Sequence, residues 1–244
     1  MGHKGQTKGH AKEHATRLAP QAPKVLVTAG PTHEPIDPVR FIGNRSSGRL
    51  GIAIAIESVR RGTPTTLLLG PVGELVGSED PRLVIRRFRT AAELEALLGE
   101  ESPRASLVVM TAAVADFRPR QVATTKIPRG RTVEEGLRLD LEPVPDLVAA
   151  LAARRPPGQR ICGFALESAE RLEARAMEKL RSKGLDAVVA NPLETMDAPT
   201  IAGRLLHADG RVELPPGHPS PLGKEAFAAW LLDRLMSGDA ASGA

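Results

Sequence analysis

Residues 25–30 read VLVTAG, residues 44–61 read NRSSGRLGIAIAIESVRR, and residues 65–70 read TTLLLG. The first and third stretches are short apolar runs, which are typical of strands buried on both faces of a sheet. The stretch between them is interpreted as a helix from position 52 to 61. A strand, a helix and a second strand in this order predict a unit with two parallel strands.

The same alternation continues along the chain. Further strands are predicted at 84–88, 107–110, 161–165 and 187–190. The capping box Thr90–Glu93 and the pair Pro145–Asp146 each mark the start of a helix, and Gly184 ends a helix predicted over 169–183. The predicted fold class is therefore α/β, a Rossmann-like and mostly parallel sheet with helices on both faces.

The last quarter of the chain changes character. Apolar runs at 201–206 and 211–214 flank the turn signal HADG, which predicts an appended β-hairpin at about 200–215. Ser220 and Pro221 are expected to start a terminal helix. Its predicted core face carries Phe227, Trp230, Leu231 and Leu235.

The expected domain organisation is simple. Residues 1–23 contain lysines and histidines with almost no apolar pattern, so we expect a disordered basic tail there. Residues 24–238 are expected to form a single Rossmann-like domain, and residues 239–244 a C-terminal tail.

Composition excludes several classes of protein. Of the 244 residues, 41% are hydrophobic and 25% charged, and no apolar run approaches the roughly 20 residues that span a bilayer. We expect a soluble, cytoplasmic protein with no membrane partner. Cys162 is the only cysteine, which excludes an internal disulfide and a cysteine-based metal cluster, and we predict no metal ligands.

Aromatic content and charge bear on the ligand. Aromatic residues make up 2% of the chain and tyrosine is absent, so few side chains can stack on single-stranded bases, and nucleic acid is not an expected partner. A mechanism that needs a tyrosine acid is excluded as well. The net charge of +4 favours anionic small molecules.

The first strand–helix junction is a candidate anion site. Gly30 ends the first strand, and Ser46, Ser47, Gly48 and Arg49 lead into the helix, where free backbone N–H groups face an anion. Gly30 and Gly48 are too far apart for the dinucleotide fingerprint G-x-G-x-x-G. The alternative is that these glycines only turn the chain and let helix and strand pack.

Two later segments carry further candidate groups. The loop TAAVADFRP at 111–119 follows a strand, so Ala112, Ala113 and Asp116 are expected at the carboxyl edge of the sheet, where such folds bind ligands. Lys126 and Arg129 are interpreted as a polyphosphate lid or as a solvated charge run. Lys179 and Lys183 share a helix face, where they bind a ligand or complement the helix dipole.

The motifs, taken in order, resemble the phosphopantothenate-cysteine ligase family, also called phosphopantothenoylcysteine synthetase. They read TAGPTHEPIDPVRFIGNRSSGRLG (28–51), TAAVADFRP, KIPR (126–129), PVPDLV (143–148), GFALES (163–168), EKLRSKGLDAVVANP (178–192) and SPLGKEAFA (220–228). The resemblance covers about residues 24–235 and indicates a stand-alone ligase of bacterial type.

The resemblance implies a two-step ligation in coenzyme A biosynthesis. The carboxylate of 4'-phosphopantothenate attacks the α-phosphate of a nucleoside triphosphate and releases pyrophosphate, with Mg²⁺ on the phosphates. Bacterial members generally use CTP and eukaryotic ones ATP, and the bacterial style of the motifs favours CTP here. The amine of L-cysteine then displaces CMP from the acyl-cytidylate intermediate. Family members are homodimers that use the region of the 200–215 hairpin for dimerisation, so a homodimer is expected.

The resemblance also assigns roles to residues. Asn44 is expected to hold the acyl group, and Lys126 to meet the triphosphate where charge develops. The nucleotide and phosphate contacts expected from it are Gly30, Ser46, Ser47, Gly48, Arg49, Ala112, Ala113, Asp116, Pro145, Asp146, Phe164, Lys179 and Lys183. Pro128 and Val144 depart from the family pattern, which leaves their effect on nucleotide binding open.

Two other functions remain open at this point. One is a nicotinamide-dependent oxidoreductase on the same sheet, although the glycine fingerprint and a tyrosine acid are missing. The other is a non-catalytic nucleotide-binding protein, which Pro128 and the basic tail would suit.

Overall fold

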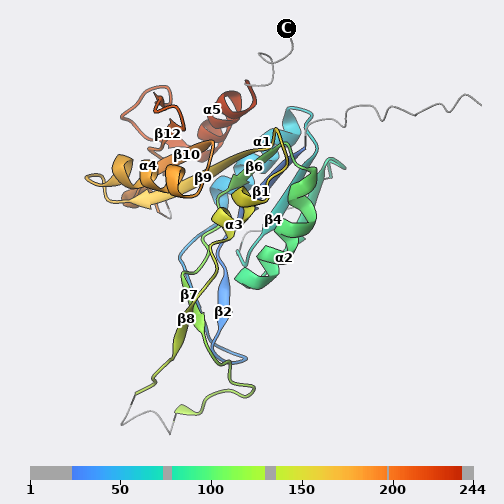
Figure 1. The fold of residues 1–244 in the computed structure, drawn as a ribbon, viewed down its shortest axis with the longest axis vertical. Helices are drawn as coiled ribbons and strands as arrows, with labels where there is room; N and C mark the ends of the chain where they lie inside the picture. Colours follow the sequence, from blue (N-terminus) through green and yellow to red (C-terminus); the bar gives the residue numbers. More distant parts are fainter. Residues whose placement is uncertain (1–23, 74–78, 130–135, 197, 238–244) are drawn as a thin grey trace, which may run out of the picture.

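The computed structural model describes residues 24–73, 79–129, 136–196 and 198–237. Within them, a central eight-stranded sheet has the order β13-β12-β10-β9-β6-β1-β4-β5 (Figure 1). The six strands β10, β9, β6, β1, β4 and β5 are parallel, β12 is antiparallel to β10, and β13 is antiparallel to β12. The α/β prediction is confirmed. The tails expected at 1–23 and 239–244 lie outside the described residues.

The six predicted parallel strands all form. They are β1 (Val25–Ala29), β4 (Thr65–Leu69), β5 (Leu83–Arg87), β6 (Leu107–Met110), β9 (Arg160–Glu167) and β10 (Ala187–Pro192). Every residue of β1, β4 and β6 is buried. Their continuous apolar runs follow from this double burial, because both faces of a parallel sheet are covered.

Helices cover both faces of the sheet, as predicted. On one face, α1 (Arg49–Arg60) and α5 (Lys224–Met236) pack over side chains such as Val27 and Leu67. On the other face, α2 (Ala91–Glu101), α3 (Leu147–Ala153) and α4 (Leu172–Ser182) pack over Leu26 and Val108. Phe227, Trp230, Leu231 and Leu235 are buried in the first of these cores, as expected.

The predicted helix boundaries rest on local hydrogen bonds. The Thr90 hydroxyl accepts from the backbone N–H of Glu93, and the Asp146 carboxylate accepts from that of Ala149 at 3.0 Å. These two side chains cap α2 and α3. Gly184 has a φ of 63° directly after α4, a conformation that glycine adopts without a steric penalty.

The C-terminal region differs from its prediction in two ways. The predicted hairpin forms from β12 (Arg204–His207) and β13 (Val212–Glu213) and is added to the central sheet through pairing with β10, but it begins later than residue 200. β11 (Thr200–Ile201) instead pairs with β14 (Leu222–Gly223). Because β14 occupies the residues after Pro221, α5 begins at Lys224, and the predicted helix start at Ser220 and Pro221 is wrong.

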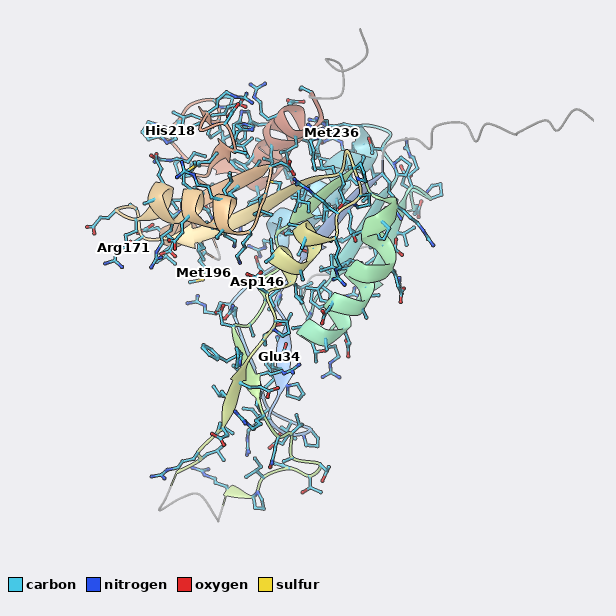
Figure 2. The ribbon with its side chains drawn as sticks, in the orientation of Figure 1. Glu34, Asp146, Arg171, Met196, His218 and Met236 are labelled. Atoms are coloured by element: carbon cyan, nitrogen blue, oxygen red, sulfur yellow. The ribbon has the colours of Figure 1, made fainter. Side chains whose placement is uncertain are left out.

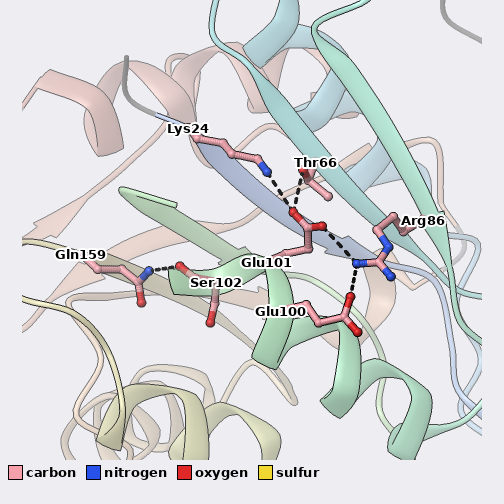
Figure 3. A network of polar contacts seen from close by, with 7 residues as sticks. All are labelled: Lys24, Thr66, Arg86, Glu100, Glu101, Ser102 and Gln159. Atoms are coloured by element: carbon pink, nitrogen blue, oxygen red, sulfur yellow. Dashed lines mark hydrogen bonds and ion pairs between the residues drawn. The ribbon is translucent and has the colours of Figure 1, made fainter. Parts of the chain in front are cut away.

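An ion-pair network lies near the amino end of β1 (Figure 3). The largely buried Glu101, at the end of α2, accepts from Lys24 Nζ at 2.9 Å and from Arg86 Nη1 at 3.1 Å. The hydrogen bond from Lys24, followed by that from Arg86, holds the pKa of Glu101 below its ordinary value despite desolvation. The network therefore ties α2 to β1 and β5.

An arm projects from the body of the molecule (Figure 1). We define the arm as residues 33–43 and 117–143, as far as they are described. It contains two antiparallel pairs, β2 (His33–Pro35) with β3 (Phe41–Gly43), and β7 (Phe117–Pro119) with β8 (Leu141–Pro143). Short helical turns follow at Ser102–Arg104 and Leu193–Thr195 elsewhere in the chain.

Candidate active site

The strand order reverses between β1 and β6, and in open α/β sheets ligands bind at the carboxyl ends of the strands beside such a reversal. The two loops that leave these strands are joined by backbone hydrogen bonds. The N–H of Ala113 donates to Gly30 O at 2.9 Å, and that of Thr32 donates to Ala113 O at 3.2 Å. The predicted residues Gly30, Ala112 and Ala113 therefore lie together.

The start of α1 lies beside this junction. Gly48 precedes the helix with a φ of 71°, and no side chain caps the helix. The first backbone N–H groups of α1 thus lack a side-chain acceptor, which is the arrangement that binds anions at helix N-termini. Ser46, Ser47 and Arg49 flank Gly48, and the Ser46 hydroxyl accepts from the Gly48 N–H at 3.4 Å.

Packing explains part of the glycine pattern as well. A Cβ at position 51 would lie 2.6 Å from the Cβ of Ala29, so α1 approaches β1 too closely for any side chain there. Gly51 serves packing, whereas Gly48 serves the left-handed turn into α1. Turning and packing therefore account for these two glycines, and anion binding at the start of α1 stays a prediction.

Asn44 connects the loop after β1 to the loop after β6. We call the carboxyl edge of the sheet at these two loops the ligand edge. Its side-chain Nδ2 donates to Val114 O at 2.8 Å, and the residue is exposed. The loop then continues to Asp116, whose carbonyl accepts from the Val144 N–H at 2.9 Å. This second bond joins the loop to the segment that contains Pro145 and Asp146.

A charged group lies on α3 and α4 next to Asp116. Lys183 Nζ is 3.0 Å from Asp146 Oδ2, and Lys179 Nζ donates to Phe164 O. Figure 2 shows Asp146 at the start of α3, where the arm meets the body. The two lysines expected from the sequence thus lie in the last turn of α4 and at its C-cap, and Lys183 pairs with the Asp146 carboxylate.

Burial strongly perturbs Lys179. Desolvation, followed by the charge of Lys183, lowers its pKa from 10.5 to about 8, although Asp146 and Asp116 act in the opposite direction. A half-buried lysine with a lowered pKa near the carboxyl edge of the sheet is typical of functional sites. The pKa of Asp146 is lowered too: burial raises it, but the N–H of Ala149 and the Lys183 ammonium outweigh that effect.

Two predicted residues stand apart from this group. The Phe164 side chain packs against the core under α1 and α5, the opposite face of the sheet from Lys179. Lys126 is exposed on the arm, and its Nζ makes no hydrogen bond or ion pair to another described residue. The structure therefore does not bring Lys126 into contact with Asn44.

Sequence reasoning missed three polar residues of the motif EPIDPVR. Glu34, Asp37 and Arg40 lie on the arm, and the first two are buried, with 3% of their surface exposed. Buried carboxylates need hydrogen-bond donors. Glu34 Oε1 accepts from the Ala91 N–H at 2.8 Å, and Asp37 accepts from several donors described below. A signal for them exists in the sequence, because two acidic residues three positions apart are unusual in a loop that only connects elements.

A cavity of about 360 Å³ lies at the opposite, amino edge of the sheet, lined by residues that include Arg160, Asp186 and Glu213. None of the predicted site residues lines it. No group of three His, Cys, Asp or Glu side chains among the described residues is placed to hold a metal ion. In the same part of the chain, no helix has the length and apolar character needed to cross a membrane.

The strand order, with helices on both faces of the sheet, defines a Rossmann-like α/β protein, and the uncapped start of α1 has the geometry of an anion-binding helix N-terminus. Residues 21–237 match the family described as DNA/pantothenate metabolism flavoprotein C-terminal domain. This chain belongs to that family.

Three similar proteins illustrate the relationship. The Coenzyme A biosynthesis bifunctional protein CoaBC of Mycobacterium bovis is 42% identical over 200 residues, which cover 77% of this chain and 46% of that protein. The CoaBC of Escherichia coli K12 is 36% identical over 218 residues, covering 87% and 51%. The crystal structure of the C-terminal domain of a CoaBC is 30% identical with a TM-score of 0.71, covering 89% of this chain and 96% of that one. This chain thus spans about half the length of its curated relatives.

Proposed function

We propose that this chain is a phosphopantothenate-cysteine ligase that acts in coenzyme A biosynthesis. The observation that carries the proposal is the meeting of the family motifs at one edge of the sheet, where Asn44, Asp116 and Lys179 come from three different segments. The CoaBC relatives support the pathway, and a family match over 21–237 supports residues 24–238 as one ligase domain.

The first step forms an acyl-nucleotidylate. A carboxylate oxygen of 4'-phosphopantothenate attacks the α-phosphorus of CTP, the bond to the β-phosphate breaks, and pyrophosphate leaves. The N-terminal N–H groups of α1 and the residues from Ser46 to Arg49 bind phosphate oxygens in this proposal. Asn44 holds the acyl group, because its amide already lies beside the Val114 carbonyl at the ligand edge.

The second step forms the amide. The amine of L-cysteine attacks the acyl carbon, the bond to the nucleotide oxygen breaks, CMP leaves, and the amine releases a proton. Lys179 and Lys183 contact the nucleotide, with Asp116, Pro145 and Asp146 around base and ribose. Phe164 contributes through its carbonyl, which positions Lys179, rather than by covering the base with its ring.

Lys126 and Mg²⁺ are the positive charges that would offset the negative charge of the triphosphate. A lysine on the arm stabilises developing charge when the loop meets bound nucleotide. Mg²⁺ is usually held by phosphates with one or two carboxylates, and Asp116 and Asp146 are carboxylates at this edge. We propose that the ion enters with the nucleotide and neutralises charge on its phosphates.

A homodimer is part of the proposal, and the arm is its proposed interface. More than half of the exposed large apolar side chains among the described residues lie on the arm, including Val39 at 61%, Phe41 at 52% and Phe117 at 54% exposure. Contiguous exposed apolar surface marks association sites. The 200–215 hairpin is the competing interface, with Val212 and Leu214 exposed.

Product formation tests the function directly. Purified protein is incubated with Mg²⁺, 4'-phosphopantothenate, L-cysteine and either CTP or ATP, and mass spectrometry follows phosphopantothenoylcysteine and the nucleotide monophosphate. We expect product and CMP in equal amounts with CTP. Product with ATP alone would contradict the choice of nucleotide, and no product with either nucleotide would contradict the ligase assignment. Reduction of a nicotinamide cofactor would favour the oxidoreductase.

A further inference from the structure

The loop that carries Lys126 is fixed to the β2–β3 turn on both sides of the lysine. Before it, the N–H of Ala123 donates to Ile36 O at 2.9 Å. After it, the N–H of Ile127 donates to Asp37 Oδ2 at 3.1 Å. Lys126 therefore lies between two anchored residues, although its own side chain is exposed.

Asp37 is the centre of this anchorage. Its Oδ1 accepts from the N–H groups of Val39 and Arg40 at 2.8 and 2.7 Å, which closes the turn between β2 and β3. Its Oδ2 accepts from Ile127, on a segment 90 residues away, and from Arg40 Nη1 at 3.0 Å. One buried carboxylate thus shapes the turn with one oxygen and holds the distant loop with the other.

Arg40 completes the contact from the other side of the peptide. Both of its terminal nitrogens, Nη1 and Nη2, donate to Ile127 O at 3.3 Å. Ile127 is therefore held at its N–H by Asp37 and at its carbonyl by Arg40. Burial raises the pKa of Asp37, but the backbone N–H donors of Val39, Ile127 and Arg40 and the Arg40 charge outweigh this effect. The pKa is therefore lowered overall, and the carboxylate is ionised at neutral pH.

The turn itself is attached to the body. Glu34 Oε1 accepts from the Ala91 N–H at the start of α2, and the His33 N–H donates to Arg89 O at 2.7 Å. Figure 2 shows Glu34 on the arm beneath the body. Hydrogen bonds at His33 and Glu34 therefore hold the start of this segment to the body, and Asp37, three residues after Glu34, holds the loop of Lys126.

We propose that Asp37 is a positioning residue that sets the place of Lys126 through its hydrogen bond to the Ile127 backbone. This inference rests on the ligase function proposed above and assigns to EPIDPVR the task of connecting two motifs. Without Oδ2 as acceptor, Ile127 keeps only the contact of its carbonyl with Arg40, which has lost its own partner Asp37, and Lys126 samples positions away from the nucleotide.

The substitution Asp37→Asn isolates that contact. The asparagine keeps one oxygen for the backbone N–H groups of Val39 and Arg40. It presents an amide nitrogen to the Ile127 N–H and the Arg40 guanidinium, and both of these groups are donors that cannot accept a hydrogen bond. We expect kcat to fall ten- to a hundredfold, with KM for 4'-phosphopantothenate changed less than threefold. Asp37→Ala extends the effect to the turn. Asp209→Ala is the matched control, because Asp209 accepts from the Arg211 N–H in a turn of the β12–β13 hairpin.

Two readouts separate positioning from a general loss of structure. In a double-mutant cycle, Asp37→Asn is expected to have almost no further effect on kcat once Lys126→Ala is present. In hydrogen exchange, the amides of Ala123 and Ile127 are expected to exchange at least tenfold faster in Asp37→Asn, with β1 and β6 unchanged.

The outcomes also separate this inference from the proposed function. Independent effects of Asp37→Asn and Lys126→Ala on kcat would overturn the positioning role, and so would unchanged exchange at Ile127. If the wild-type protein shows no ligase activity, the ligase proposal fails, whereas the exchange experiment still decides whether Asp37 anchors the loop.

Discussion

The body and the arm of this protein use apolar residues in opposite ways. In the body, strands such as β1 and β4 bury every side chain between two layers of helices. On the arm, Phe41 and Phe117 are half exposed, and strands of three residues are paired with one neighbour each. A two-stranded ribbon is marginally stable by itself in water.

The difference indicates how work is divided between the two regions. In the function proposed above, the body supplies the scaffold and the phosphate contacts, and the arm supplies Lys126, next to Ile127, whose N–H donates to Asp37. Substitutions in the body should therefore change stability first. Substitutions on the arm should change activity or assembly first.

The largest effect is expected from Lys126→Ala on the arm. Loss of a cation that stabilises developing charge typically reduces turnover by about 10²- to 10³-fold. Steady-state pyrophosphate release measures this effect, and the thermal unfolding midpoint should stay unchanged because Lys126 is exposed. Arg138→Ala removes a positive charge from the returning segment of the arm and serves as control. An equal loss in both variants would show that only net charge matters.

Assembly is the next effect in size. Phe117→Asp places a charge in the exposed apolar surface of the arm, and we expect dimer dissociation to become about 100-fold easier. Sedimentation equilibrium over a range of concentrations measures it. Val212→Asp tests the hairpin in the same way. If Val212→Asp yields monomers and Phe117→Asp does not, the hairpin is the interface.

Glu101→Gln tests the body. This change removes the charge that Lys24 and Arg86 share, and breaking such a buried network is expected to cost about 2 kcal/mol. Urea unfolding measures the free energy, while kcat should change less than twofold. Because the folded pKa of Glu101 is lowered, its contribution to stability is present above the unfolded value and is lost as pH falls through the folded value. A loss of activity at constant stability would contradict this division.

The smallest effect is a pH dependence at Lys179. With a pKa of about 8, the free protein loses this positive charge as pH rises above 8, and nucleotide affinity should fall by up to about tenfold per pH unit. Calorimetric titration with CTP from pH 7 to 9.5 measures it. Lys179→Arg keeps the charge throughout that range and should flatten the profile, whereas Lys183→Arg should not.

The same shift affects folding with the opposite sign. Between about pH 8 and 10.5 the unfolded chain binds more protons at this lysine than the folded one, so stability should rise with pH. This rise should be absent in Lys179→Arg.

The sequence predicted the body well because its signals are local. Continuous apolar runs marked β1, β4, β6 and β10, and the caps at Thr90 and Asp146 marked helix starts within a residue. The terminal helix was placed too early, since the pairing of β14 with β11 is a long-range contact that no local pattern records.

The arm could not be predicted in the same way. Its strands are three residues long, and β2, β7 and β8 each end in proline, so neither helical nor alternating periodicity exists to detect. For the site, the motifs pointed to Asn44, Gly48 and Lys179, which the fold places near the loops that follow β1 and β6, and their roles stay predictions. The contact between Asp37 and Ile127 joins distant segments, and only the folded structure reveals it.

Pyrophosphate release in the absence of cysteine tests the proposed ligase function most directly. Protein, CTP and Mg²⁺ are mixed with or without 4'-phosphopantothenate, in the wild type and in Lys126→Ala. We expect about one pyrophosphate per site in the wild type, only when 4'-phosphopantothenate is present, and a release at least 100-fold slower in the variant. Release that does not require 4'-phosphopantothenate, or that is equally fast without Lys126, would contradict the account.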